Sequence, residues 1–158
     1  MKNFLPGFVL IICLSCSTSH SDMPASVDTG IAYDSLLAAE LGADAYGMRS
    51  YVFAYLKEGP KRDQDSVEAA RIQRAHLDNI RRLAQEGKLV VAGPFMDDHE
   101  VKGIYIFAVE SLEEAEQLTN SDPAVQAGRL VMELHPWYGS AAMMQINENH
   151  KRIVKEKI

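Results

Sequence analysis

His76 is the residue whose type and setting most clearly indicate chemistry. It shares an apolar stripe with Ile72, Ile80 and Leu83, which follow the i, i+4, i+8, i+11 spacing of one helical face. An imidazole in such surroundings can take up or release a proton near neutral pH. A core histidine bonded to a backbone carbonyl fits the same pattern, so the sequence alone leaves a structural and a catalytic interpretation open.

Asp122 is the candidate partner of this histidine. It lies in Asn120-Ser121-Asp122-Pro123, ahead of the last expected strand. Asp followed by Pro is typical of a helix N-cap and the first helical residue, which is a purely structural role. Because a carboxylate has two oxygens, one of them can cap the helix while the other bonds an imidazole. Both roles are therefore expected to be compatible.

The other titratable residues form no recognisable constellation. Asp97-Asp98-His99 falls in an expected hairpin tip, His135 on the last strand, and His20 and His150 in terminal segments. The sequence has no His-Glu-x-x-His, paired Cys-x-x-Cys or calcium-loop pattern, so we expect neither a metal nor another cofactor. A formal net charge of −6 argues against a nucleic-acid partner, because phosphate binding requires clustered Lys and Arg.

The elements that must position these residues follow from hydrophobic periodicity and turn signals. Strands are expected at 50–56, 88–92, 103–109 and 130–137 because these runs are rich in β-branched and aromatic residues. Helices are expected from Asp65 or Ser66 to Gln85, from the Ser111 capping box to Thr119, and from Asp122 to Gly128. The resulting β-α-β-β-α-β order predicts a ferredoxin-like α+β domain.

The expected strands carry apolar side chains on both faces. Tyr51, Val52, Phe53 and Tyr55 show this in the first strand, and residues 104–107 show it in the third. Since helices cover only one face of such a sheet, the other face needs a partner, most simply a second copy in a homodimer. Cover by an N-terminal helix or by the basic tail at 139–158 is the alternative.

The N-terminal region has the pattern of an export signal. Lys2 precedes an apolar run from Phe4 to Leu14, which is too short to span a bilayer but suits a signal h-region. The run ends in Leu14-Ser15-Cys16, which resembles a lipobox. We therefore expect a signal peptide at 1–15 and lipidation of Cys16, with cleavage of an ordinary secretory signal near Ser19 as the alternative.

Lipidation would attach the protein to the cell envelope through its acyl chains alone. Ser17 follows the cysteine in place of the Asp that retains lipoproteins in the inner membrane, which by analogy favours the periplasmic side of the outer membrane. The segment 16–48 is expected to be a tether with a short helix that starts at Asp34-Ser35. The folded domain is expected at 49–138.

Short motifs occur in order along this domain: Tyr51-Val-Phe-Ala-Tyr-Leu-Lys with Gly59-Pro60, Ala75-His76-Leu77, Gly87-Lys-Leu, Ala92-Gly93-Pro94-Phe95, Gly103-Ile, Glu113-Glu-Ala115, Ser121-Asp122-Pro123-Ala124 and Pro136-Trp137. The series resembles the YCII-related domain family. The resemblance implies a ferredoxin-like fold of the dimeric α/β-barrel type and an active-site pair at His76 and Asp122. It also implies that Gly93, Pro94 and Phe95 help to line the cleft.

Two functional hypotheses follow. The first is a cofactor-free enzyme of the isomerase, lyase or hydrolase type, with a His-Asp pair acting on a small organic molecule. This hypothesis is supported by the resemblance, since related domains occur near aromatic-compound degradation and include dehydrochlorinase-like and muconolactone-isomerase-like chemistry. The second is a non-catalytic domain at the cell envelope that binds a ligand or a protein.

Overall fold

The structure is a computed structural model that describes residues 30–156. Within these residues, the folded unit spans 34–156. The expected signal peptide at 1–15, the lipidation site Cys16 and the tether up to residue 29 lie outside the described residues. Within the described part of the chain, no helix is both long enough and apolar enough to cross a membrane.

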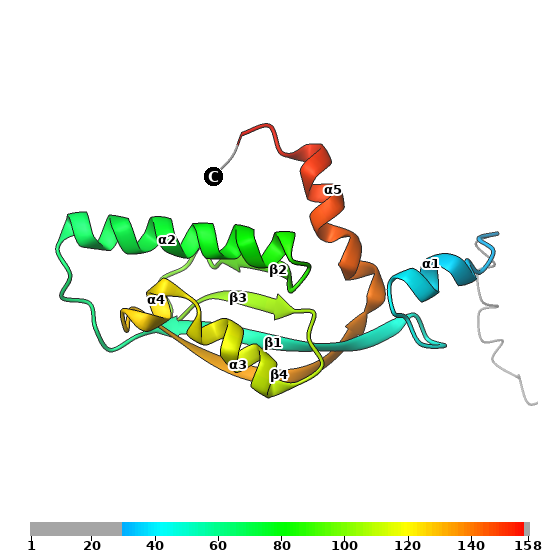
Figure 1. Cartoon of the computed structure of the whole chain (residues 1–158), viewed down its shortest axis with the longest axis horizontal. Helices are drawn as coiled ribbons and strands as arrows, with labels where there is room; N and C mark the ends of the chain where they lie inside the picture. Colours follow the sequence, from blue (N-terminus) through cyan, green and yellow to red (C-terminus); the bar gives the residue numbers. More distant parts are fainter. Residues whose placement is uncertain (1–29, 157–158) are drawn as a thin grey trace, which may run out of the picture. The chain divides into compact units, whose positions relative to one another are not determined.

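A single antiparallel sheet forms the centre of the domain (Figure 1). Its strands stand in the order β2-β3-β1-β4, with bounds β1 Met48–Glu58, β2 Leu89–Pro94, β3 Val101–Phe107 and β4 Leu130–Ser140. The helices are α1 Ser35–Glu40, α2 Ser66–Gln85, α3 Leu112–Asn120, α4 Pro123–Gln126, the short 3₁₀ helix η1 Ala141–Gln145 and α5 Ile146–Ile153. The expected β-α-β-β-α-β order of a ferredoxin-like α+β domain is confirmed.

Local capping signals fix the helix boundaries. The Asp65 carboxylate accepts hydrogen bonds from the Val67 and Glu68 backbone N–H groups at 2.9 Å, which starts α2. After α2, Gly87 adopts a φ of +70°, a left-handed conformation that glycine reaches without strain. The Ser111 hydroxyl accepts from the Glu114 N–H at 3.1 Å and starts α3, as the capping box predicts.

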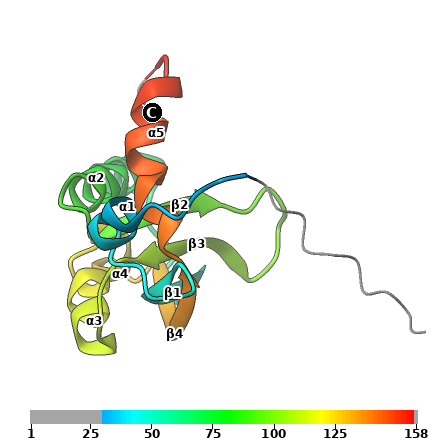
Figure 2. The same cartoon turned by 90° about the vertical axis from the view of Figure 1, so that its right-hand side faces the viewer.

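Alternation along β1 separates the two faces of the sheet. Val52, Ala54 and Leu56 join a core cluster with Leu83 of α2 and Ala115 of α3. Figure 2 shows α2 and α3 on the same side of the sheet, in agreement with these contacts. Burying each large apolar side chain of this core stabilises the fold by about 1.5–3 kcal/mol.

The opposite face is only partly covered. At one end Met143 and Met144 of η1 pack against a cluster that contains Tyr51. The C-terminal tail therefore covers part of this sheet face through η1, as the alternative to a homodimer predicted. On the same face, Trp137 beside Tyr51 and Tyr55 farther along β1 are each 38% exposed.

Strand β4 is longer than the sequence indicated. The register pairs Met48 with Ser140, so Gly139 and Ser140 belong to the sheet and not to the tail. At the other end, Gly59 donates its N–H to the Arg129 carbonyl at 2.9 Å. A Cβ at Gly59 would lie 2.3 Å from the Gly128 carbonyl oxygen, so only glycine allows this approach. The contact holds the α4 region against the end of β1.

Candidate functional site

Helix α2 carries His76 on its buried stripe. Ile72, His76, Asn79 and Leu83 are the buried residues of this helix, as expected for side chains that face the sheet. His76 is 8% exposed, so its imidazole lies between α2 and the strands and not at the outer surface of the helix.

Asp122 reaches the same place from the N-terminus of α4. Its Oδ1 accepts the Ala124 N–H at 2.8 Å, and Pro123 forms the first helical residue. The carboxylate is 0% exposed, and both of its oxygens lie 2.9 Å from His76 Nδ1. The structure thus brings together two residues 46 positions apart, and Asp122 both caps α4 and bonds the imidazole, as expected.

This contact decides where the imidazole carries its proton. A carboxylate is an acceptor, so His76 Nδ1 carries a hydrogen and donates it to Asp122. In the neutral ring Nε2 then presents a lone pair. The hydroxyl oxygen of Tyr105 on β3 lies 3.3 Å from Nε2. Tyr105 therefore donates to the nitrogen that would act as a base.

Tyr105 was not identified from the sequence, although strand alternation contained the signal. It pairs with Ala54 in the sheet, and both lie on the helix-facing side in the core cluster. Burial and then the negative charge of Asp122 raise the pKa of Tyr105 well above its ordinary value. Its phenol is consequently a neutral hydrogen-bond donor throughout the physiological pH range.

Asn79 is a second residue that sequence reasoning missed. Its Nδ2 donates to Asp122 Oδ2 at 3.4 Å, while its Oδ1 accepts from Arg82 Nη2 at 2.8 Å. Arg82 also donates to the Ser121 hydroxyl at 3.2 Å. Asn79 lies three residues after His76 and three before Arg82, spacings that put all of them on neighbouring turns of α2. The amide orients the buried carboxylate.

A cavity of about 310 Å³ opens onto this cluster. Its polar lining comes from four side chains, those of Gln73, His76, Lys102 and Tyr105, and the remainder is mostly aliphatic: Leu56, Leu77, Ile80, Ala92, Gly93, Pro94, Gly103 and Leu130. This volume lies at the lower end of the range typical of small-molecule sites and suits a ligand of about one ring.

Gly93 and Pro94 line the cavity, in the place that was expected of them, whereas Phe95 is not part of the lining and is 45% exposed. Pro94 is the last residue of β2. The Phe95 backbone N–H still bonds the Lys102 carbonyl at 2.9 Å. We attribute the exposure of the Phe95 side chain to its position in the turn beyond the strand.

The family model for the YCII-related domain matches residues 48–138, more than half of the chain. This chain belongs to the YCII-related domain family. It is also 34% identical over 62 residues to the uncharacterized protein YjpA of Bacillus subtilis (strain 168), an alignment that covers 39% of this chain and 71% of YjpA.

Among solved structures, 5-chloro-2-hydroxyhydroquinone dehydrochlorinase (TftG) of Burkholderia phenoliruptrix, in complex with 2,5-dihydroxybenzoquinone, matches with a TM-score of 0.43. It is 22% identical and covers 55% of this chain and 92% of the enzyme.

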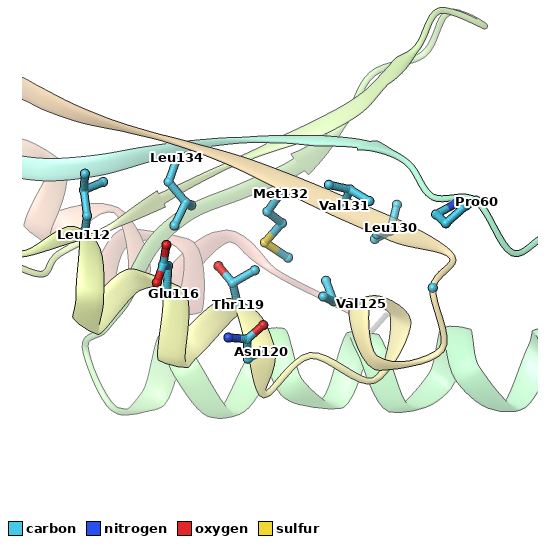
Figure 3. A pocket seen from close by; sticks show the side chains of 11 residues that line it. Pro60, Leu112, Glu116, Thr119, Asn120, Val125, Leu130, Val131, Met132 and Leu134 are labelled. Carbon is cyan, nitrogen blue, oxygen red and sulfur yellow. The ribbon is translucent and has the colours of Figure 1, made fainter.

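A second pocket of this YCII-related domain, about 660 Å³ in volume, lies between α3 and β4 (Figure 3). Leu112, Glu116, Thr119 and Asn120 border it from α3. Figure 3 shows these side chains directed toward Met132 and Leu134 of β4. Leu130 lines both this pocket and the His76 cavity, so the two pockets are adjacent, but neither His76 nor Tyr105 borders the larger one.

The remaining candidates from the sequence, Asp97, Asp98, His99 and His135, do not line the cavity. His99 is exposed at the hairpin tip, and His135 Nε2 lies 2.9 Å from Glu133 on an exposed part of β4. Asp98 is 3.1 Å from Lys102 Nζ. Among the residues that the structure describes, no group of three or more His, Cys, Asp or Glu is arranged to hold a metal ion.

Proposed function

We propose that this YCII-related domain catalyses proton transfer on a small, largely apolar organic molecule bound in the His76 cavity. The observation that carries the proposal is the geometry of one imidazole. His76 Nδ1 lies 2.9 Å from both oxygens of the buried Asp122, and the ring borders the cavity. Such a dyad sets the tautomer so that Nε2 can accept a proton, and the carboxylate then stabilises the imidazolium.

The lining of the cavity favours proton transfer over covalent catalysis or glycoside-type hydrolysis. It contains no Ser, Cys, Asp or Glu, so neither a seryl hydroxyl or thiol nucleophile nor a pair of carboxylates borders the cavity. The Lys102 amine in the lining is ion-paired with Asp98 and Glu58, and the Tyr105 phenol is held protonated, so neither is activated as a nucleophile. The proposed isomerase or lyase chemistry needs no cofactor, because one base and one hydrogen-bond donor suffice to move a proton between positions of a substrate.

The proposal is tested by substitution of His76 beside a matched histidine. Single-ring ketones, lactones, quinones and halogenated hydroquinones are incubated with the soluble domain, and isomerisation or elimination is followed by absorbance and NMR. We expect His76→Ala to lose the activity by a factor of about 10²–10⁴. His99→Ala, at the exposed hairpin tip, should retain it. Equal activity of His76→Ala and the wild type would exclude the proposed mechanism.

A binding domain without turnover is the competing function. This function would be favoured if a ring compound binds saturably, if substitution of His76 leaves its affinity unchanged, and if the bound compound undergoes no chemical change. The aliphatic lining of the cavity is compatible with this outcome, so the binding screen and the turnover screen are run on the same compounds.

We further propose that the domain forms a homodimer through the sheet face opposite α2 and α3. The support is the exposure of aromatic side chains there, because Tyr55 and Trp137 each remain 38% exposed although η1 packs on part of this face. Tyr55→Asp should convert a dimer to a monomer in sedimentation velocity. Tyr46→Asp, at an exposed turn, is the control. A monomeric wild-type protein at micromolar concentration would contradict the proposal.

For the whole chain we propose export and attachment to the outer membrane through lipidated Cys16. The lipobox-like Leu14-Ser15-Cys16 supports this proposal. Incorporation of labelled palmitate into the wild type, lost in Cys16→Ala and kept in Cys13→Ala, is the expected result. A soluble, unlabelled mature protein that starts near residue 20 would instead show ordinary secretion.

A further inference from the structure

We propose that Tyr105 is a catalytic residue that donates its phenolic hydrogen bond to a carbonyl oxygen of the substrate, which makes the cavity a site for enolising cyclic ketones. This inference rests on the proposed function of His76. It names the substrate class and assigns a role to a residue of the same site. Its support comes from the position, the partners and the protonation of Tyr105.

The position of Tyr105 places an acid group next to the base. The Tyr105 hydroxyl oxygen and His76 Nε2 are 3.3 Å apart, and both side chains line the cavity. A carbonyl oxygen and the hydrogen-bearing α-carbon of a ketone are separated by one atom, the carbonyl carbon. The two groups are therefore close enough for one substrate to meet the donor at its oxygen and the base at its α-hydrogen.

The resting hydrogen bond is weak enough to be exchanged. At 3.3 Å, the contact between the Tyr105 hydroxyl and His76 Nε2 is longer than usual for a hydrogen bond from a hydroxyl. His76 Nδ1, by contrast, has two carboxylate oxygens at 2.9 Å and keeps its proton. A substrate carbonyl can thus take the Tyr105 hydrogen bond, and this frees the Nε2 lone pair to act as a base.

The phenol stays protonated where it is needed as a donor. Tyr105 is buried at the cavity floor, and burial together with the Asp122 charge raises its pKa. A neutral donor in an apolar site stabilises a developing enolate more strongly than water does, because it is already oriented and needs no reorganisation. The role corresponds to that of a neutral acid kept beside a base in known enolising sites.

The proposed step balances without any co-reactant. In a β,γ-unsaturated ketone, His76 Nε2 takes a proton from the α-carbon. The electron pair of the broken C–H bond forms a C=C bond to the carbonyl carbon, and the π electrons of the C=O bond move to the oxygen. The oxygen becomes an enolate that accepts the hydrogen bond of Tyr105. The C=O bond then re-forms, the C=C bond shifts to the α- and β-carbons, and the electron pair of the former β,γ double bond takes the same proton from His76 at the γ-carbon. This yields the conjugated ketone and restores the neutral imidazole.

The test uses cyclohex-3-en-1-one, a single-ring β,γ-unsaturated ketone, and follows its conjugation to cyclohex-2-en-1-one by ultraviolet absorbance. We expect Tyr105→Phe to lower kcat by about 10²–10³-fold, the usual effect of removing one oxyanion donor. Tyr46→Phe, at an exposed turn and outside the cavity lining, should match the wild type. Circular dichroism and thermal unfolding establish that each variant folds.

A second measurement separates hydrogen bonding from packing. The probe is 4-nitrophenol, whose neutral and ionised forms absorb differently and whose phenolate imitates an enolate. The wild type should favour the ionised form of the bound probe, and Tyr105→Phe should lose this preference by at least tenfold. An equal preference in both proteins would show that Tyr105 only packs, and would overturn the inference.

The outcomes distinguish the two levels of the proposal. Turnover that falls in His76→Ala but stays within threefold of the wild type in Tyr105→Phe overturns the role of Tyr105 and leaves the acid–base function standing. Turnover unchanged in His76→Ala overturns both. If the wild type does not conjugate the ketone, the enolising role is excluded. Proton transfer on another class of compound would still be detected in the broader screen.

Discussion

Asp122→Asn is the substitution whose consequences the structure defines most sharply. Asparagine caps helices as well as aspartate does, so its side-chain oxygen can keep the 2.8 Å bond from the Ala124 N–H. The amide nitrogen then occupies the position of Oδ2, next to His76 Nδ1. The remaining oxygen, 2.9 Å from Nδ1, already accepts the Ala124 N–H, whereas the amide N–H that now faces Nδ1 is a donor. We therefore expect Nδ1 to become the acceptor and the imidazole to move its hydrogen to Nε2.

The expected loss of activity follows from this change of tautomer. With a hydrogen on Nε2, His76 presents no lone pair to the cavity and cannot accept a proton from the substrate. The same replacement in a hydrolase triad lowers kcat by about 10⁴-fold, and we expect a factor of about 10²–10⁴ for conjugation of cyclohex-3-en-1-one. The tautomer itself is read from the ¹⁵N shifts of the His76 ring.

The cost in stability is expected to be small. The new amide nitrogen faces Asn79 Nδ2, which donates to Asp122 Oδ2 at 3.4 Å in the wild type, so two donors meet and this bond is lost. Asn79 cannot simply rotate its amide, because its Oδ1 accepts from Arg82. We expect the free energy of unfolding to fall by about 1 kcal/mol, the value typical of one hydrogen bond.

Asp65→Asn is the matched control. Asp65 caps α2 in the same manner, through one oxygen that accepts from Val67 and Glu68, and it is exposed. This variant should retain both turnover and stability. If Asp122→Asn keeps the wild-type tautomer and turnover, Asp122 serves only as a cap and the dyad has no chemical role.

Three further predictions concern the supporting structure. Folding raises the pKa of Tyr105 above its ordinary value of 10.0, so the protonated phenol favours the folded state. This contribution to the free energy of unfolding is fully present below about pH 10 and is lost as the pH rises toward the pKa of the folded state. Unfolding free energies measured in urea should therefore fall more steeply above pH 10 in the wild type than in Tyr105→Phe, by up to about 1.4 kcal/mol per pH unit, and parallel curves would contradict the effect. Gly59→Ala should destabilise the domain by about 1–3 kcal/mol in thermal unfolding, because its Cβ would lie 2.3 Å from the Gly128 oxygen. The control Gly93→Ala has open space at its Cβ and should change the free energy of unfolding by less than about 0.5 kcal/mol. Asn79→Ala should lower the free energy of unfolding by about 1–2 kcal/mol and reduce turnover less than Asp122→Asn does. Asn120→Ala, at an exposed position, is the control. An unchanged melting temperature of Asn79→Ala would show that the Asn79 amide does not stabilise the fold.

The sequence by itself determined the helices and strands of the domain and two residues of the candidate site, His76 and Asp122. Local signals sufficed for this: the Asp65 and Ser111 caps, the helical stripe that turns His76 inward, and the Asp122-Pro123 pair that starts α4. The order of the elements and the family motifs then predicted the ferredoxin-like fold, and with it the meeting of His76 and Asp122.

Only the tertiary structure decided what surrounds that pair. Tyr105 reaches His76 because β3 pairs with β1 in the register that puts Tyr105 opposite Ala54, and a shift of one residue would turn the phenol to the other face. The role of Asn79 depends on a carboxylate 43 positions away. Such contacts are set by strand register and helix packing, which no local pattern encodes, and they surround the His76–Asp122 pair with the groups to which we assign the proposed chemistry.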